Sequence, residues 1–436
     1  MVTRSFLRRT ATRLLPLAFI AFAPGCGADF DSPDKVDSMR VFAVQKDPAY
    51  APPTTDPMNP SVVNMSMLWT PGPHHKQSEV QRVWFSGCDD LPGDQYFTCL
   101  GYMHFLWKLY TYSDAKRPLP ADQTSWSPVD DTALLPEYQL KIHEWLPTIP
   151  EAYIPYILST LHIGVGSSFQ YRVPLGIIEG HAPSSDPSIP PFGVGFVFFT
   201  ACAGHIEPAS AWSNVNSVTQ LRDATMGFPF SCIDDTTGTQ QGPEDFISGY
   251  TQQFVYGNGS ANNNPNIAPT ENTAAKTAMT FDGKDVNVAA YCIDGACNDS
   301  LTSGPANPPI DVPSDICKND SALVFPHVKK CSGKCPTYDY TPTLDAAKNN
   351  DDTRFGPPQS SAGAKQEQMW INYYADKGSL KHTVRLLQDA TEGWNQGKFD
   401  NTWTPPNEAG PVNFWSVVHD VRGGASWIRF LVCVDD

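Results

Sequence analysis

The stretch "VNFWSVVHDVRGGASWIRFLVCVD" (Val412–Asp435), near the end of the chain, carries the pattern that decides the fold. Two runs of alternating β-branched and aromatic residues flank the short segment Asp420–Gly424. Such runs are typical of β-strands, and two adjacent glycines supply the positive φ that a tight turn requires. The stretch therefore predicts an antiparallel hairpin. Asp420 and Arg422 at its turn pair with each other, face a ligand, or are simply solvated, as most turn charges are.

Runs of the same kind recur along most of the chain. They are short, rich in β-branched or aromatic residues, and bounded by Gly, Pro, Asn or Asp. They cover residues 38–48, 61–70, 80–88, 169–178, 193–204, 246–257, 284–292, 368–378 and 382–390. Many short strands with turn signals between them predict a mainly β protein built from two tandem Ig-like antiparallel β-sandwiches.

Two low-complexity stretches divide the chain. The polar stretch 258–273 lacks large apolar residues apart from a single isoleucine and marks a boundary, which predicts one sandwich over 38–262 and a second over 263–436. The stretch 345–368 is too long for an ordinary turn, so we expect a flexible loop inside the second sandwich.

One segment, 134–164, has apolar residues at helical rather than strand spacing. Leu140, Trp145, Ile154, Leu158 and Leu161 follow this spacing, and the prolines between them favour two short helices over one long helix. We expect a helical insertion across the first sandwich. It serves either as a lid that completes a core or as a contact surface for a partner.

The N-terminus has the order of a secretory signal: arginines, a short apolar run from Leu14 to Phe22, and small residues before Cys26. The run Ala23-Pro24-Gly25-Cys26 resembles the lipobox of bacterial lipoproteins, with proline an uncommon occupant. This resemblance implies a signal peptide over 1–25, a lipidated Cys26 and a tether over 26–37. Two or three acyl chains hold a protein on a membrane essentially permanently. The alternative is an ordinary cleaved signal with an incidental cysteine.

Composition and charge exclude some functions. Apolar residues make up 41% of the chain, which is typical of a globular protein, and the formal net charge is -16. Without the four arginines of the signal, 26 basic residues remain against 46 acidic ones, a net charge of -20. A surface this acidic repels phosphate backbones, so we expect no binding to nucleic acid. No later apolar run is long enough to span a membrane, so attachment depends on the N-terminal lipid.

The chain has eleven cysteines, and lipidation of Cys26 leaves ten for disulfides. We expect Cys88 to pair with Cys99, Cys202 with Cys232, and Cys292 with Cys297. The pairing of the other four is left open: Cys317, Cys331, Cys335 and Cys433. The spacings "CIDGAC" and "CSGKC" also occur in zinc sites, but an export signal favours disulfides and no histidine lies at zinc-finger spacing; His327 is the nearest.

Several segments of the mature chain resemble a group of putative envelope lipoproteins from myxobacterial genomes. The segments are "MRVFAV", "FSCIDD", "SGYTQQFVYG", "NNNPNI" and, most specifically, "FWSVVHDVRGGASWIRFLVCV". The resemblance implies Ig-like domains on a lipid anchor. It brings no catalytic residue, and the helical insertion has no counterpart in it.

No motif selects a catalytic site or a metal site. The sequence has no G-x-S-x-G, H-E-x-x-H or P-loop motif. His74 and His75 are adjacent in a loop. The pairs Asp234–Asp235 and Asp351–Asp352 lie near other oxygen ligands, as in weak calcium sites, but without the spacing of an EF-hand. We therefore assign no catalytic residue, metal or cofactor.

The last domain is crowded with aromatic residues, which either pack in the core or form a face that stacks on sugars or peptides. For the second alternative, the candidate binding face consists of Trp394, Trp403, Asp420 and Arg422.

The sequence thus predicts a lipid-anchored protein of the bacterial outer membrane, on the cell surface or the periplasmic face. We expect a non-catalytic binding, adhesion or scaffold module whose partners are the membrane and a polysaccharide or another envelope protein. The alternatives are an envelope hydrolase acting on glycan or peptide, and a docking subunit that uses the helical insertion.

Overall fold

The computed structural model describes the chain from Asp34 to Asp436 with gaps. The described residues are 34–56, 59–89, 99–118, 124–145, 150–181, 190–213, 215, 227–257, 262–265, 279–286, 312, 314–320, 325–342, 344, 367–390, 392–395 and 400–436. The signal, Cys26, Cys292, Cys297, Asp351, Asp352 and most of the expected loop 345–368 lie outside them. No helix among these residues is long and apolar enough to cross a membrane.

The N-terminal half of the described chain contains two sheets that face each other. Three antiparallel strands form the smaller sheet in the order β1 (Arg40–Asp47), β3 (Val62–Thr70), β7 (Ser168–Arg172). The larger sheet has the order β2 (Tyr50–Ala51), β11 (Phe246–Tyr256), β8 (Phe192–Ala203), β4 (Val80–Asp89), β6 (His162–Val165), β5 (Ser125–Trp126). Between them lies an apolar core that includes Met65, Trp69, Trp84 and Tyr171.

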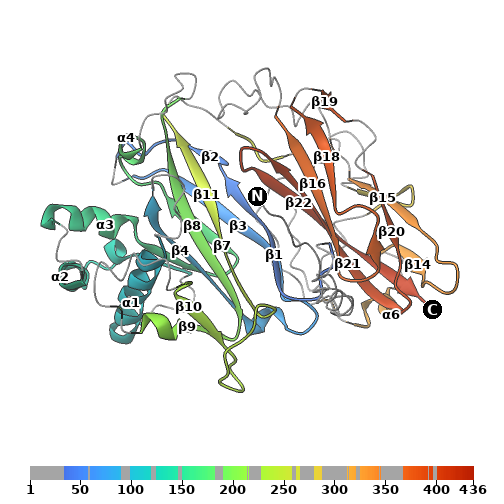
Figure 1. Cartoon of the computed structure of the whole chain (residues 1–436), viewed down its shortest axis with the longest axis horizontal. Helices are drawn as coiled ribbons and strands as arrows, with labels where there is room; N and C mark the ends of the chain where they lie inside the picture. Colours follow the sequence, from blue (N-terminus) through green and yellow to red (C-terminus); the bar gives the residue numbers. More distant parts are fainter. Residues whose placement is uncertain are drawn as a thin grey trace, which may run out of the picture. The chain divides into compact units, whose positions relative to one another are not determined.

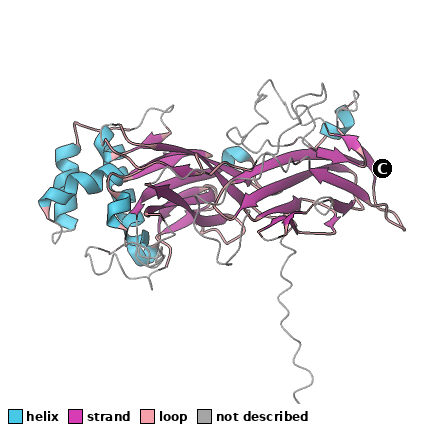
Figure 2. Ribbon diagram, turned by 90° about the horizontal axis from the view of Figure 1, so that it is seen from above, coloured by secondary structure: helices cyan, strands magenta, loops and turns pink. Residues whose placement is uncertain are grey.

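Three helices cover the other face of the larger sheet: α1 (Leu100–Lys116), α2 (Leu135–Trp145) and α3 (Ile154–Thr160). They share a second core with β4 and β8, in which Phe85 and Phe198 pack against Leu106, Ile142 and Leu158. Most helical residues of the described chain gather here, at one side of the strands (Figure 2). The two short helices expected over 134–164 are therefore confirmed, and they complete a core as a lid does.

Helix α1 is absent from the sequence prediction. Its sequence, "LGYMHFLWKLYTYSDAK", is rich in aromatic residues, which favour strands in isolation. Apolar side chains also lie on more than one side of the helix, so helical periodicity is weak. The helix forms because Cys99 at its start is tied to β4 and because Met103, Phe105 and Leu109 are buried in the core.

The remaining short elements of this half border these layers. The strands β9 (His205–Pro208) and β10 (Phe230–Ile233) form a two-stranded sheet, and α4 (Ile177–Gly180) follows β7. Single 3-10 turns are η1 (Gln77–Glu79), η4 (Pro128–Asp130), η5 (Glu151–Tyr153) and η6 (Ser210–Trp212).

The C-terminal half contains a second pair of sheets (Figure 1). The smaller has the order β13 (Lys284–Asp285), β12 (Met279–Phe281), β15 (Tyr338–Pro342), β20 (Asn401–Thr404), β17 (Ser379–Leu380). The larger has the order β14 (His327–Lys329), β22 (Ala425–Asp435), β21 (Gly410–Asp420), β16 (Met369–Ala375), β18 (Val384–Asp389), β19 (Gly393–Trp394). The short helix α6 (Ile316–Asn319) precedes β14. Phe281, Tyr340, Trp403, Phe414 and Phe430 fill the core between these sheets.

The expected mainly β architecture is thus confirmed, and the terminal hairpin forms as β21 and β22. No sheet in the described chain mixes strands from before and after residue 262. Two strand pairs are parallel rather than antiparallel, β2 with β11 and β14 with β22. The Ig-like relationship stays a prediction.

The two halves meet through a fourth apolar cluster. Phe42 and Leu68, on the outer face of the small N-terminal sheet, pack against Trp415, Val417 and Ala425 of the terminal hairpin. The rings of Phe42 and Trp415 are stacked with centroids 5.0 Å apart. Strand β21 is therefore buried on both faces, since Phe414 and Val418 point into the core of its own sandwich.

The end of the segment expected as a tether, 26–37, is docked on the second half. The backbone N–H of Ala375 donates to the carbonyl of Asp34 (3.0 Å), and the N–H of Val36 donates to the carbonyl of Ala375 (3.0 Å). The side chain of Val36 is buried in the cluster between the two halves. Asp34 and Val36, which lie inside the expected tether, therefore belong to the folded part.

Four disulfides lie in the described chain. Cys88–Cys99 and Cys202–Cys232 match the expected pairs. The cysteines whose pairing the sequence left open form Cys317–Cys433 and Cys331–Cys335. The first of these ties α6 to β22.

Two buried histidines, His104 and His162, and the half-buried His419 predict a loss of stability in acid. Burial lowers the pKa of His104, His162 and His419 to about 4. Below about pH 6.5 the unfolded chain takes up protons that the folded chain refuses, so the free energy of unfolding falls as the pH drops toward 4. We expect urea denaturation to show a loss on the order of 2 kcal/mol for each histidine.

The variant His104→Leu, which removes one of these groups, is expected to flatten this pH dependence. The exposed His143 of α2 offers a matched control, and His143→Leu should leave the dependence as in the wild type. Equal slopes for the wild type and His104→Leu would contradict the assignment.

Candidate functional site

A polar pocket of about 460 Å³ lies on the outer face of the small sheet β1–β3–β7. Its floor consists of two rows of side chains in cross-strand register. Gln45, Ser66 and Ser168 form one row. Asp47, Asn64 and Gln170 form the next. Because residues two apart on a strand point to the same face, all six side chains share this surface.

The wall of the pocket comes from the segment that leads into β5. Thr124 and Ser125 line it, and the backbone of Thr124 is held by a hydrogen bond from the N–H of Val165 (2.7 Å). Met65 and Phe169 complete the lining. Eight of the ten lining residues are polar, and Asp47 is the single charged one.

Two amides of the pocket have fixed positions. The Gln170 Nε2 donates to Asn64 Oδ1 (3.2 Å) across the sheet. The Gln45 Nε2 donates to the carbonyl of Ala425 (3.0 Å) and to Ser426 Oγ (3.3 Å), which places this end of the pocket beside the terminal hairpin. Hydroxyls and amides both donate and accept hydrogen bonds, so the lining matches a ligand that carries many hydroxyl groups.

The turn of the terminal hairpin forms a buried polar cluster near the pocket. The Asp420 Oδ1 accepts from the N–H groups of Arg422 (2.8 Å) and Gly424 (2.7 Å), and its Oδ2 accepts from Asn262 Nδ2 (3.2 Å). The Arg422 guanidinium forms a bidentate pair with Glu367, with Nε–Oε1 and Nη2–Oε2 distances of 2.6 and 2.8 Å. Glu367 thus belongs to the fixed structure, although the sequence placed it in the flexible loop.

The buried Lys46 joins this cluster from β1. Its Nζ donates to the carbonyl of Gln252 (2.8 Å). Burial lowers the pKa of Lys46 to about 8, against the raising effect of nearby Asp420, and burial raises the pKa of the Asp420 carboxyl. The cluster connects β1, the 262–265 segment and the terminal hairpin, so it fastens the two halves to each other.

The binding face expected from Trp394, Trp403, Asp420 and Arg422 does not form as an exposed surface. Trp403 is fully buried, and its Nε1 donates to the carbonyl of Lys377 (3.0 Å), which satisfies its polar atom inside the core. Asp420 and Arg422 are 3% and 2% exposed. Trp394 alone of the four reaches the surface in part. Trp403 packs in the core, and Asp420 and Arg422 belong to the buried polar cluster.

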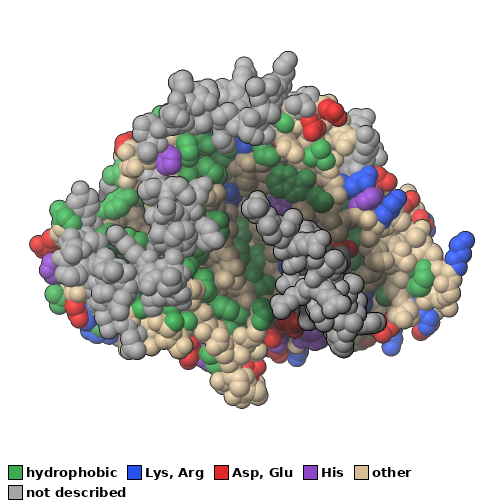
Figure 3. All heavy atoms as spheres, in the orientation of Figure 1, with side chains coloured by type: hydrophobic (Ala, Val, Ile, Leu, Met, Phe, Trp, Pro, Cys, Tyr) green, Lys and Arg blue, Asp and Glu red, His purple; other side chains and the backbone are tan. Residues whose placement is uncertain are grey.

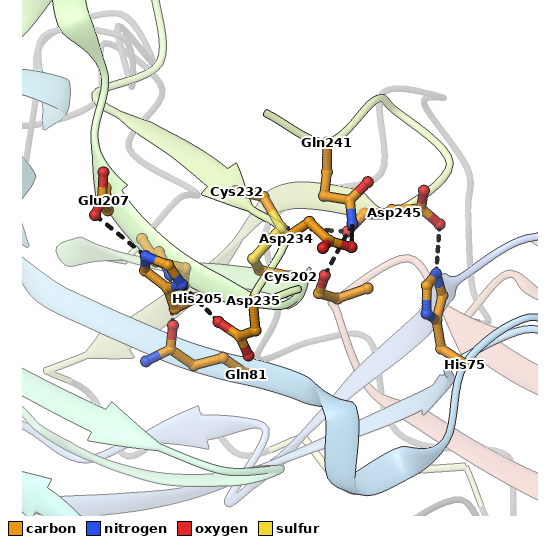
Figure 4. Close-up of a disulfide and its surroundings, with 12 residues drawn as sticks. His75, Gln81, Cys202, His205, Glu207, Cys232, Asp234, Asp235, Gln241 and Asp245 are labelled. Carbon is orange, nitrogen blue, oxygen red and sulfur yellow. Dashed lines mark hydrogen bonds and ion pairs between the residues drawn. A yellow bond between two sulfur atoms is a disulfide. The ribbon is translucent and has the colours of Figure 1, made fainter. Parts of the chain in front are cut away.

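The acidic pair considered for calcium is engaged by protein donors (Figure 4). The Asp234 Oδ1 accepts from the N–H groups of Thr236 (2.8 Å) and Thr237 (2.6 Å), which lowers the pKa of this carboxyl. Asp235 lies against His205 Nδ1 (2.6 Å), on the opposite edge of the ring from Glu207 at Nε2 (3.1 Å). The ring separates the two carboxylates, so their oxygens do not converge on a common point.

His75 has a comparable role on the far side of the Cys202–Cys232 disulfide (Figure 4). Its Nε2 lies 2.7 Å from Asp245 Oδ1. Together, these histidine–carboxylate contacts hold the segments on either side of the Cys202–Cys232 disulfide in place.

The pocket was not anticipated from the sequence. Its lining residues are spread from Gln45 to Gln170, and only strand register brings them together. One signal was present: in "VVNMSMLWT" the polar residues Asn64 and Ser66 alternate with apolar ones, as Ser168 and Gln170 do in "SFQYR".

Comparisons with known proteins give no family. No protein-family model and no curated protein matches the chain. A structure of Escherichia coli alpha-2-macroglobulin activated by porcine elastase is 10% identical, with 93% of this chain and 22% of that chain covered and a TM-score of 0.16. Dimeric latent PorU from Porphyromonas gingivalis is 9% identical, with 92% and 24% covered and a TM-score of 0.16. The chain thus spans less than a quarter of either neighbour, and similarity this low carries no argument about function.

Among the described side chains visible in Figure 3, charged groups of both signs are scattered over the face.

Removing one partner of the buried ion pair should destabilise the protein strongly. In Glu367→Gln the Arg422 guanidinium stays buried without its charge partner, which typically costs about 3–5 kcal/mol. We expect the midpoint of urea denaturation to fall accordingly. Glu408→Gln, at an exposed position before β21, is the matched control and should unfold like the wild type. An unchanged midpoint for Glu367→Gln would show that the buried ion pair does not stabilise the fold.

Proposed function

We propose that the chain is a lipid-anchored protein of the bacterial cell envelope that acts as a non-catalytic binding and scaffold module. We further propose that the pocket on β1–β3–β7 takes a neutral, hydroxyl-rich ligand, such as part of a polysaccharide. The observation that carries this proposal is the double row of polar side chains in register, which lines a pocket of about 460 Å³. Ligand sites of this size hold small molecules or short oligomers.

The chemistry of the lining supports a saccharide over a charged ligand. A sugar hydroxyl donates and accepts at once, and so do the serine and threonine hydroxyls and the paired amides of the pocket. The carboxylate of Asp47 can accept hydrogen bonds from two sugar hydroxyls and donates none. Glycoside hydrolysis ordinarily requires two carboxylates on either side of the bond, and the described lining residues include one. This favours binding over the alternative of a glycan hydrolase.

The short N-terminal segment supports the scaffold part of the proposal. With Cys26 as the lipidated residue, the seven residues 27–33 separate the anchor from the first docked residue, Asp34. Fully extended, they reach about 25 Å. The folded part then stays close to the membrane that holds it, as a fixed envelope module requires.

One observation favours the alternative in which the chain is a docking subunit that binds a partner through its helical layer. Leu140 of α2 and Tyr156 of α3 are 66% and 44% exposed, although both belong to the helical layer. A partner that covers this layer would bury them, and the variant Leu140→Glu would then lose co-purification while it kept the fold.

The ligand proposal predicts binding that depends on the two paired amides. The probes are soluble peptidoglycan disaccharide, cello-oligosaccharides and dextran fragments, measured by titration calorimetry. We expect at least one probe to bind, and Asn64→Ala with Gln170→Ala to weaken it by about 10- to 30-fold, since two hydrogen bonds are lost. The control pair Gln240→Ala with Ser248→Ala lies outside the pocket and should bind like the wild type. No binding to any probe, or equal binding by the Asn64/Gln170 variant, would overturn the ligand proposal.

The anchor proposal predicts the behaviour of Cys26→Ala in cells. The wild type should fractionate with membranes, and the variant should be released, because the lipid supplies the attachment. Protease shaving of intact cells, followed with an antibody to the C-terminal half, then separates surface from periplasm. Loss of the antibody signal indicates the surface, and protection until the outer membrane is opened indicates the periplasmic face. Tight membrane attachment of Cys26→Ala would overturn the proposal.

A further inference from the structure

Three potential metal ligands meet at the end of the terminal hairpin. Ligand atoms of Asp320, His327 and Cys433 all lie within 4.8 Å of one another. Cys433 is bonded to Cys317 with an S–S distance of 2.10 Å, so a second sulfur lies beside the group. The four residues come from three elements: α6 and the residue after it, β14, and β22.

The register between β14 and β22 brings the residues of this cluster together. His327 and Cys433 are partners on the parallel strands β14 and β22, and the N–H of Cys433 donates to the carbonyl of Pro326 (2.8 Å). Val432 and Val434 belong to the core of the second sandwich. Because neighbouring strand residues alternate in direction, Cys433 and Asp435 point to the opposite face, where the disulfide holds α6.

The imidazole of His327 is oriented from both sides. Its Nδ1 lies 2.9 Å from Asp435 Oδ1, and its Nε2 lies 3.4 Å from Asp320 Oδ2. In the tautomer whose Nδ1–H donates to Asp435, the lone pair on Nε2 points toward the Asp320 carboxylate, so the two can act as ligands of one metal cation between them. A carboxylate behind a histidine in this way is the usual support of a histidine that ligates zinc.

The surroundings of the cluster suit a metal more than an exposed ion pair. The side chains of Asp320 and His327 are 3% and 19% exposed, and Cys433 is fully buried. The Asp320 Oδ2 also accepts from the N–H of Phe325 (2.9 Å), which fixes the carboxylate.

We infer that the Cys317–Cys433 disulfide is the oxidised form of a metal site, and that after reduction Cys317, Cys433, His327 and Asp320 hold one Zn²⁺. Two thiolates, one imidazole and one carboxylate form a four-coordinate set that matches the tetrahedral preference of zinc. The metal then replaces the covalent link between α6 and β22. This inference does not depend on the lipid anchor or on the pocket.

The chemistry balances with a dithiol as the reductant. The dithiol gives two electrons and two protons to the Cys317–Cys433 bond and becomes a disulfide itself, and two cysteine thiols form. Binding of Zn²⁺ then releases both thiol protons to solvent, because the thiolate is the ligand form. Exchange with the oxidised dithiol reverses both steps: its disulfide takes back two electrons and two protons, the Cys317–Cys433 bond forms again, and the metal leaves.

The test uses residues 27–436, reduced with a dithiol, freed of the reductant without air, and titrated with Co²⁺ alone. We expect one Co²⁺ per chain, with thiolate-to-cobalt charge-transfer absorption, tetrahedral d–d bands, and displacement by Zn²⁺. The oxidised protein should show no such absorption. His327→Ala should weaken the site at least 100-fold, and Asp435→Asn about 10- to 100-fold, as the loss of a supporting carboxylate does.

Matched cysteine variants separate this site from the other cysteines. Cys331→Ser with Cys335→Ser should keep the cobalt absorption, and Cys317→Ser with Cys433→Ser should lose it. In the reduced wild type, Zn²⁺ should also slow alkylation of Cys317 and Cys433, as mass spectrometry measures. Absence of the absorption in the reduced wild type, its persistence in the Cys317/Cys433 variant, or equal alkylation with and without Zn²⁺ would each overturn the inference.

Discussion

The burial of β21 on both faces is the constraint on which the rest of the structure depends. A strand at the surface of a sandwich needs one apolar face, but β21 presents Phe414 and Val418 to its own core and Trp415 and Val417 to the neighbouring half. The outer face of β1–β3–β7 must then be apolar where it meets β21, and Phe42 and Leu68 meet this need. The two sandwiches are therefore fixed by packing as well as by the connecting chain.

The outer face of β1–β3–β7 changes from apolar to polar within a few residues of β3. Leu68 lies in the dry contact with the hairpin, Ser66 lies at its edge, and Asn64 is exposed in the pocket. The turn of the terminal hairpin lies where the apolar contact meets the polar pocket. This position explains why the turn carries buried charged residues such as Asp420 and Arg422. Each of them has partners, and an unpaired charge in this position would weaken the contact between the halves.

Local patterns predicted most of the strands because alternation and turn residues are local signals. The runs around Val412–Asp435 and 193–204 became β21, β22 and β8 with few changes at their ends. Helix α1 was not predicted, because its stability comes from tertiary burial rather than from periodicity. The pocket and the Asp320–His327–Cys433 cluster depend on register between distant strands, and register does not follow from a single sequence. The interpretation of Trp403, Asp420 and Arg422 as a binding face was wrong because aromatic and charged residues also serve as buried contacts.

The docking of Asp34 and Val36 on Ala375 has a mechanical consequence. Any force that pulls on the chain before Asp34 first loads these two hydrogen bonds, and β16 carries the load into the centre of a six-stranded sheet. The small sheet β1–β3–β7 follows later in the chain and is shielded from the pull as long as the bonds hold. Tension at the N-terminal end therefore reaches the second sandwich before the first, although the first comes earlier in the sequence.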